Sequence, residues 1–175
     1  MTRKIAPLLA ATLLTMAWAN PASAAPPDKN PNSSQCKTDK GLFDRLGGFF
    51  GIAAVVNRFS DAILVNPVLN ENPALVAWNQ TQAPTRLPGL KFMRTMWVAS
   101  MVGGPIKFTG LPLEQAHERF DLTPTQFNEV ASEIVKALQF YNVAQSDIDQ
   151  LACIYGTSMR NVVSSTQPKA VTPPK

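Results

Sequence analysis

The sequence has 175 residues, and its 16 Lys and Arg against 12 Asp and Glu give a formal net charge of +4. The basic residues form no cluster, which argues against a nucleic-acid-binding protein, because such proteins concentrate Lys and Arg where they meet phosphates. The length suits a single domain with one sizeable core.

The N-terminus has the pattern of a secretory signal peptide. Arg3 and Lys4 precede an apolar run over residues 5–18, and Ala-Ser-Ala at residues 22–24 has the small-x-small pattern of a cleavage site. The run is short for a membrane span, which disfavours an uncleaved anchor. We expect residues 1–24 to be removed, leaving 14 basic and 12 acidic residues. The mature protein is then expected to be periplasmic or secreted, with no membrane attachment.

Both ends of the mature chain are rich in Pro and polar residues. Residues 25–39 are expected to form a flexible leader and residues 165–175 a disordered tail. The chain has two cysteines, Cys36 and Cys153. In an oxidising compartment they could pair across a long loop, or each could be a separate thiol, with Cys153 buried on a helix.

The N-terminal half of the domain predicts two helices and an irregular segment. A short helix over residues 41–46 ends at Gly47 and Gly48, a typical helix stop. Residues 49–65 are apolar on almost every side at helical spacing, so this helix should be central in the fold. Residues 67–89 contain four prolines and weak periodicity, and we interpret them as a long irregular connection.

The C-terminal half predicts helices only. An apolar helix over residues 90–102 ends at Gly-Gly-Pro, and a short helical stretch follows at residues 113–119. Thr-Pro-Thr-Gln at residues 123–126 predicts a capping box that opens the next helix. Ser146 is predicted to begin the last helix. No segment alternates at period two, so the predicted fold class is all-α, with no sheet.

His117 is the only histidine. One histidine cannot build a His-rich zinc site, which needs three or four protein ligands, but a single imidazole can hold a haem iron from one side. Taken alone, a single histidine is more often a surface or hydrogen-bonded structural residue. The absence of a Cys-x-x-Cys-His motif excludes covalent c-type haem attachment.

Two glycine motifs in the sequence resemble those of a known protein family. Leu-Phe-Asp-Arg-Leu-Gly-Gly at residues 42–48 resembles the opening of the truncated haemoglobins, and Gly-Gly-Pro-Ile-Lys-Phe-Thr-Gly at residues 103–110 resembles their second Gly-Gly motif. His117 then falls where that family has its proximal haem ligand, and Leu122, Thr123 and Phe127 continue in register. The resemblance covers roughly residues 42–163 and is closest to group I.

The resemblance implies a two-over-two helical sandwich over residues 40–164 that holds haem b non-covalently, with His117 as the ligand of the iron. A haem also needs an apolar slot between helices. The residues expected to line that slot are Phe108, Leu113, Phe127 and Val130 near His117, and Leu90, Met93, Arg94, Trp97 and Ser60 on the facing helices.

The sequence departs from the group I pattern on the side that faces the bound ligand. Ser60 stands where the family usually has a tyrosine, and Arg94 where it usually has a glutamine. Arg94 could donate to a bound ligand, extend to solvent or pair with a haem propionate. The aromatic residue that packs on the haem edge is also missing, and Trp78 or Phe92 could replace it.

Two further side chains bear on the ligand side. Met93 could supply a sulfur as sixth ligand of the iron or simply fill space in the core. Trp97 could donate its indole N–H into the pocket or merely pack.

The resemblance implies an exported haem-binding globin that binds a diatomic ligand, oxygen or nitric oxide. Nitric oxide dioxygenase activity or a peroxidase-like side activity stays open, and the former needs a reductase that this sequence does not encode. The alternatives are a six-coordinate haem protein for electron transfer or sensing, and a non-haem helical interaction module of globin ancestry. The sequence gives no indication of oligomeric state.

Overall fold

The structure, a computed structural model, describes Cys36, residues 41–157 and residues 162–163. Within these ranges the chain is helical, without a β-sheet, and the one β-type contact is an isolated bridge between Leu122 and Val163. The predicted signal peptide, nearly all of the predicted leader and the predicted tail lie outside the described residues.

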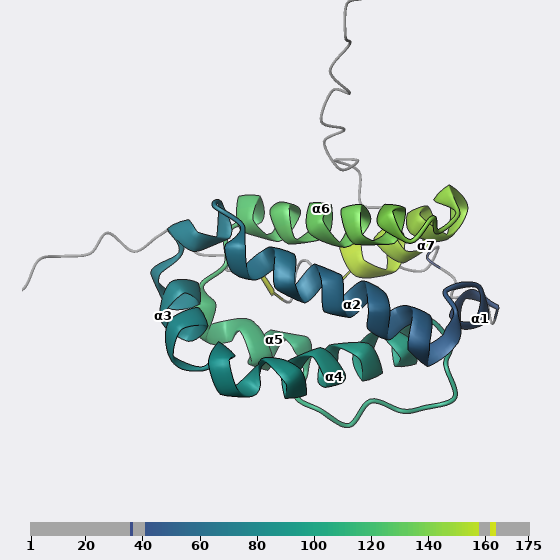
Figure 1. Cartoon of the computed structure of the whole chain (residues 1–175), viewed down its shortest axis with the longest axis horizontal. Helices are drawn as coiled ribbons and strands as arrows, with labels where there is room; N and C mark the ends of the chain where they lie inside the picture. The colour runs from purple at the N-terminus through teal and green to yellow at the C-terminus, as the bar shows by residue number, and fades with distance from the viewer. Residues whose placement is uncertain (1–35, 37–40, 158–161, 164–175) are drawn as a thin grey trace, which may run out of the picture.

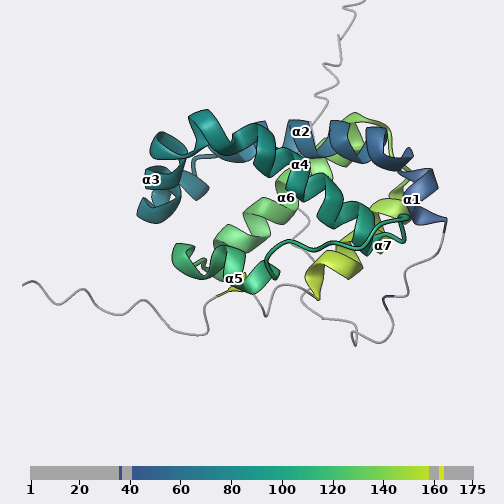
Figure 2. The same cartoon turned by 90° about the horizontal axis from the view of Figure 1, so that it is seen from below.

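Four long helices form two layers. They are α2 (Gly48–Val65), α4 (Ala83–Met101), α6 (Pro124–Phe140) and α7 (Gln145–Gly156). α2 packs against both α4 and α6, and α6 packs against α7, so α2 with α4 makes one layer and α6 with α7 the other (Figures 1 and 2). This arrangement confirms the predicted two-over-two sandwich.

In the described part of the chain, five short helices precede or connect the long ones: α1 (Leu42–Arg45), η1 (Leu69–Glu71), α3 (Pro73–Thr81), α5 (Leu113–His117) and η2 (Glu118–Phe120). α1 meets α2 at a tight turn in which Gly47 has φ of +81°, a conformation that glycine adopts without steric cost. A side chain at Gly51 would overlap the Leu46 carbonyl, so this helix junction depends on glycine.

The prediction of an irregular connection over residues 67–89 was wrong. Pro73 and Pro84 lie in the first turns of α3 and α4, where a proline loses no hydrogen bond because the N–H there has no helical partner. α4 continues through Pro88 and therefore begins well before the predicted residue 90. We therefore interpreted prolines that begin helices as prolines that prevent helix formation.

The capping box is confirmed, since Thr123 and Gln126 exchange side-chain and backbone hydrogen bonds at the start of α6. The predicted start of the last helix at Ser146 was off by one residue. α7 begins at Gln145, and its N-cap is Ala144, which has no side-chain cap bond. Asp147 in its first turn instead accepts from Arg45 Nε at 2.8 Å, which ties α7 to α1.

The largest cluster of buried apolar side chains lies where α1, α2, the end of α4, α6 and α7 meet. It consists of Leu42, Leu46, Ile52, Val56, Ala99, Val102, Leu138, Ile148 and Ile154. By length and composition α2 could cross a membrane, but the core helix of a globular domain has the same character, and α2 packs against α4 and α6.

Asn72 is a buried polar residue that joins three elements. Its Oδ1 accepts from the backbone N–H groups of Ala74 and Leu75 and caps α3, while its Nδ2 donates to the carbonyl of Phe120 at 2.8 Å and to Gln126 Oε1 at 3.2 Å. The segment that follows His117 is therefore fixed to α3 and α6 through one side chain.

Cys36 and Cys153 form a disulfide with a Cα–Cα distance of 5.7 Å across 117 residues of sequence. Of the two arrangements that the sequence left open, the structure has the paired one. The bond attaches the segment before the globular domain to α7.

We predict that Cys36→Ser/Cys153→Ser loses about 2–5 kcal/mol of unfolding free energy, because the cross-link closes a very long loop. Urea denaturation of the oxidised protein, the double variant and the reduced wild type measures this. The double variant and the reduced wild type should have the same midpoint, and equal stability of the oxidised and reduced wild type would contradict the prediction.

Asn72→Ala should cost about 2–3 kcal/mol, because the cap of α3 is lost and the Phe120 carbonyl and Gln126 lose a buried donor. Asn70→Ala is the matched control, since Asn70 is exposed and its bonds lie at the surface, and it should cost under about 0.5 kcal/mol. Thermal or urea unfolding compares them, and equal losses would show that Asn72 has no special role.

Candidate functional site

A cavity of about 380 Å³ lies between the two helical layers. Its wall is formed mainly by apolar side chains from α2, α4, α6 and the α5–η2 segment, with α7 closing one side. The ionisable side chains on it are Arg94, His117, Arg119 and Tyr155, and no Asp or Glu is among the described residues of the wall. Apolar concave sites with a few polar groups are typical of ligand and cofactor pockets.

His117 ends α5 and lies on the cavity wall. Its Nδ1 is 2.8 Å from the carbonyl oxygen of Leu113, and a carbonyl can only accept, so Nδ1 carries the proton in the neutral ring. The lone pair of Nε2 is then available to a metal ion. Burial lowers the pKa of His117, partly offset by this hydrogen bond, and the positive charges of Arg94 and Arg119 lower it further.

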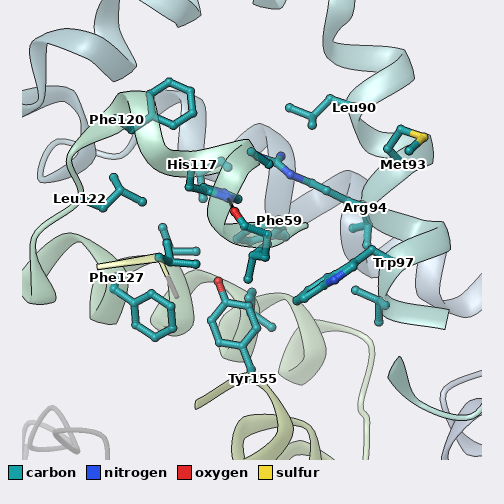
Figure 3. Close-up of a pocket in the computed structure, with 18 of the residues that line it drawn as sticks. Phe59, Leu90, Met93, Arg94, Trp97, His117, Phe120, Leu122, Phe127 and Tyr155 are labelled. Atoms are coloured by element: carbon teal, nitrogen blue, oxygen red, sulfur yellow. Dashed lines mark hydrogen bonds between the residues drawn. The ribbon is translucent and has the colours of Figure 1, made fainter. Parts of the chain in front are cut away.

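Arg94 reaches the cavity from α4, which lies across the cavity from α5 and His117 (Figures 2 and 3). Its Nη1 donates to Ser60 Oγ at 2.9 Å, and its guanidinium lies 5.4 Å from the centre of the Phe59 ring. Burial lowers the pKa of Arg94 to about 10, which still leaves the group charged at neutral pH. Arg94 is half-buried, and its guanidinium lies at the cavity wall, where Ser60 holds it.

Tyr155 of α7 is the third polar group, and two aromatic rings hold it. It stacks on Phe127 at 5.2 Å between ring centres and meets Trp97 edge to face at 6.3 Å. Its hydroxyl is directed into the pocket (Figure 3). Burial raises the pKa of Tyr155 to about 12, opposed in part by the charge of Arg94, so the hydroxyl keeps its proton.

The structure brings most of the sequence-predicted site residues together. Those that line the cavity are Phe108, Leu113, His117, Phe127, Val130, Leu90, Met93, Arg94 and Trp97. Ser60 is fully buried behind the wall, where it holds Arg94. Trp78 is on the wall and Phe92, at 62% exposure, is not, so only Trp78 is placed to replace the missing edge aromatic.

Met93 borders the cavity, but its side chain is 40% exposed and extends away from His117 in Figure 3. This position does not favour a role as an axial sulfur ligand. The methionine lies against Gly110, where an added Cβ would meet its terminal methyl. Packing at the cavity margin is the role that the structure gives it.

Sequence reasoning missed Tyr155 and Arg119 as pocket residues. Tyr155 was not singled out from the sequence, although a hydroxyl among the apolar residues of the last helix was a signal that this face meets a polar group. Arg119 is an exposed residue whose guanidinium lies 4.8 Å from the Phe120 ring centre at the edge of the cavity. Its position depends on the turn that follows His117, which the sequence did not predict in detail.

Comparison with known proteins agrees with this geometry. Residues 41–163 match the family of bacterial-like globins. The chain is 26% identical over 110 residues to a group 1 truncated hemoglobin of Mycolicibacterium paratuberculosis, an alignment that covers 63% of this chain and 74% of that protein.

Solved structures show the same fold. Truncated hemoglobin from Tetrahymena pyriformis, in its Fe(III) form, has a TM-score of 0.61 at 17% identity, covering 71% of this chain and 98% of that one. The 2/2 hemoglobin from Synechococcus sp. PCC 7002, in the cyanomet state and with covalently attached heme, has a TM-score of 0.58 at 25% identity, covering 69% and 94%. The match over residues 41–163, together with this fold, makes the chain a member of the bacterial-like globin family.

Proposed function

We propose that this protein is an exported truncated globin, of group I, that holds haem b non-covalently through His117 and binds a diatomic gas, oxygen or nitric oxide. The observation that carries the proposal is the hydrogen bond between His117 Nδ1 and the Leu113 carbonyl, since it keeps the lone pair of Nε2 available in an apolar cavity.

The residues present fit a haem. The cavity wall is largely apolar, as a porphyrin requires, and it has one metal-binding nitrogen, contributed by His117. Arg119 is exposed at the cavity edge, where a cation can pair with the carboxylates of the cofactor. Trp78 and Phe127 offer aromatic surface from α3 and α6. This set of donors suits a singly ligated haem better than a bare metal ion.

Haem held by His117 would supply an iron atom that can take a diatomic ligand. The protein supplies the ligand of the iron, the apolar surroundings and the hydrogen-bond donors. His117 binds and orients the group, the apolar wall excludes water, and Arg94 and Tyr155 offer hydrogen-bond donors to what is bound. Turnover of nitric oxide would also need a reductase as partner.

Three observations support the finer parts of the proposal. The disulfide between Cys36 and Cys153 suits an oxidising compartment, which agrees with a signal peptide and a periplasmic or secreted location. The relative in Mycolicibacterium paratuberculosis is named a group 1 protein. Both described cysteines are in the disulfide, so neither is free to bond a haem vinyl group, and non-covalent binding is proposed.

His117→Gly should abolish the globin-like absorption spectrum of the haem-loaded protein and weaken haem retention ~10-fold or more, because the ligand of the iron is lost. Added imidazole should restore the spectrum by occupying the space left by the side chain. Gln115→Ala, an exposed change on the same helix, is the control. A His117→Gly spectrum identical to wild type would refute haem ligation by this residue.

Met93→Leu should leave the ferric and ferrous spectra unchanged, because the side chain extends away from His117. A wild-type spectrum typical of His/Met ligation, lost in Met93→Leu and kept in Met96→Leu, would instead support the six-coordinate alternative. Absorption spectroscopy of the three proteins without added ligand decides between these outcomes.

A further inference from the structure

Arg94 is a half-buried positive charge on the cavity wall whose described hydrogen-bond and ring partners are neutral. Its Nη1 donates to Ser60 Oγ and its guanidinium faces the Phe59 ring. Within the described part of the chain, no carboxylate lies within ion-pair distance of Arg94, and the cavity wall contains no Asp or Glu. A charge removed from water is costly without a partner of opposite sign, so the cavity is suited to receive an anion.

The anchor of this charge is deep in the fold. Ser60 is fully buried on α2, and its hydroxyl can accept from Arg94 while its own proton goes elsewhere. The guanidinium has five N–H groups, and the bond to Ser60 uses one of them. Donors are thus left for a ligand, already oriented by the attachment to α2.

Tyr155 adds a neutral donor to the same space. Arg94 and Tyr155 both line the cavity, which they approach from α4 and α7 (Figure 3). His117 belongs to α5, on the side of the other layer (Figure 2). A ligand bound to a metal at His117, on the face turned toward α4, would meet a cation and a hydroxyl.

We propose that Arg94, positioned by Ser60, forms a subsite for a small anion across the cavity from His117, so that anionic ligands of the iron bind in preference to neutral ones. The proposal rests on the proposed haem function and adds to the diatomic gases a second ligand class, small anions that bind the ferric form. A charge-assisted hydrogen bond to an anion is about twice as strong as one between neutral groups, so the guanidinium favours anions over neutral ligands.

The carboxylates of the haem are the competing anions. Arg119 is better placed for them, because it is exposed at the cavity edge, where carboxylates can also keep their contact with water. Arg94 is attached to a residue with no solvent exposure. The two arginines therefore differ in depth, which assigns the deep one to the bound ligand.

The test is equilibrium binding of azide to the ferric, haem-loaded full chain, followed by absorption spectroscopy, with carbon monoxide binding to the ferrous form as the neutral comparison. Arg94→Leu should weaken azide binding about 10- to 100-fold and change carbon monoxide affinity less than about threefold. Arg94→Lys should recover part of the loss, and Ser60→Ala should give a smaller loss.

Lys91→Met is the matched control. Lys91 is a cation on the same helix whose Nζ pairs with Asp61 at 2.6 Å outside the cavity, so its removal should leave azide affinity unchanged. A similar loss in Lys91→Met and Arg94→Leu would reduce the effect to general electrostatics and overturn the proposal.

Two further outcomes would overturn it. Unchanged azide affinity in Arg94→Leu, with faster haem loss, would assign Arg94 to the haem carboxylates. Equal weakening of azide and carbon monoxide would show a change of pocket shape rather than charge recognition. Failure of the wild type to take up haem is distinguishable from both, because it removes the proposed function itself. If Arg94→Leu does not fold, Arg94→Lys and Ser60→Ala give the same comparison.

Discussion

The packing of α2 against a helix of each layer is the interaction on which the rest of the structure depends. Its mean hydropathy is 1.5 over 18 residues, and its buried residues, Ile52, Val56, Phe59 and Ser60, belong to a helix that packs on both α4 and α6. One helix thereby belongs to the contact surface of both layers. The layers meet along α2 and diverge from it, and the cavity lies in the space between them.

The cavity differs from ordinary core because each of its few polar groups is held in place by a neighbouring group of the protein. The Leu113 carbonyl fixes the tautomer of His117, Ser60 fixes the guanidinium of Arg94, and two aromatic rings fix Tyr155. Each group is thus pre-oriented before anything binds, which lowers the conformational cost of binding. Asn72 likewise fixes the segment after His117, because its Nδ2 donates a hydrogen bond to the Phe120 carbonyl.

How much of the fold was predictable depended on how local the signals were. The helix stop at Gly47 and the capping box of Thr123 and Gln126 were predicted because backbone geometry and hydrogen bonds within one turn decide them. Residues 67–89 were predicted wrongly because a proline that starts a helix and one that prevents it look alike in sequence. Asn72, the cap of α3, is buried and bonded to Phe120, nearly 50 positions away. This long-range contact favours a helix at residues 73–81 over an irregular connection.

For the candidate site, the sequence by itself indicated the proposed cofactor class through a resemblance: the two glycine motifs with a single histidine in register resemble the truncated haemoglobins, which implies haem held by one imidazole. It also indicated most of the cavity wall, because apolar stripes must face inward. The tertiary structure decided where Arg94 points, that Tyr155 joins the pocket, that Met93 extends away from His117, and that Cys36 pairs with Cys153. These outcomes depend on contacts between residues far apart in the chain, and side-chain direction across such contacts is set by packing rather than by residue type.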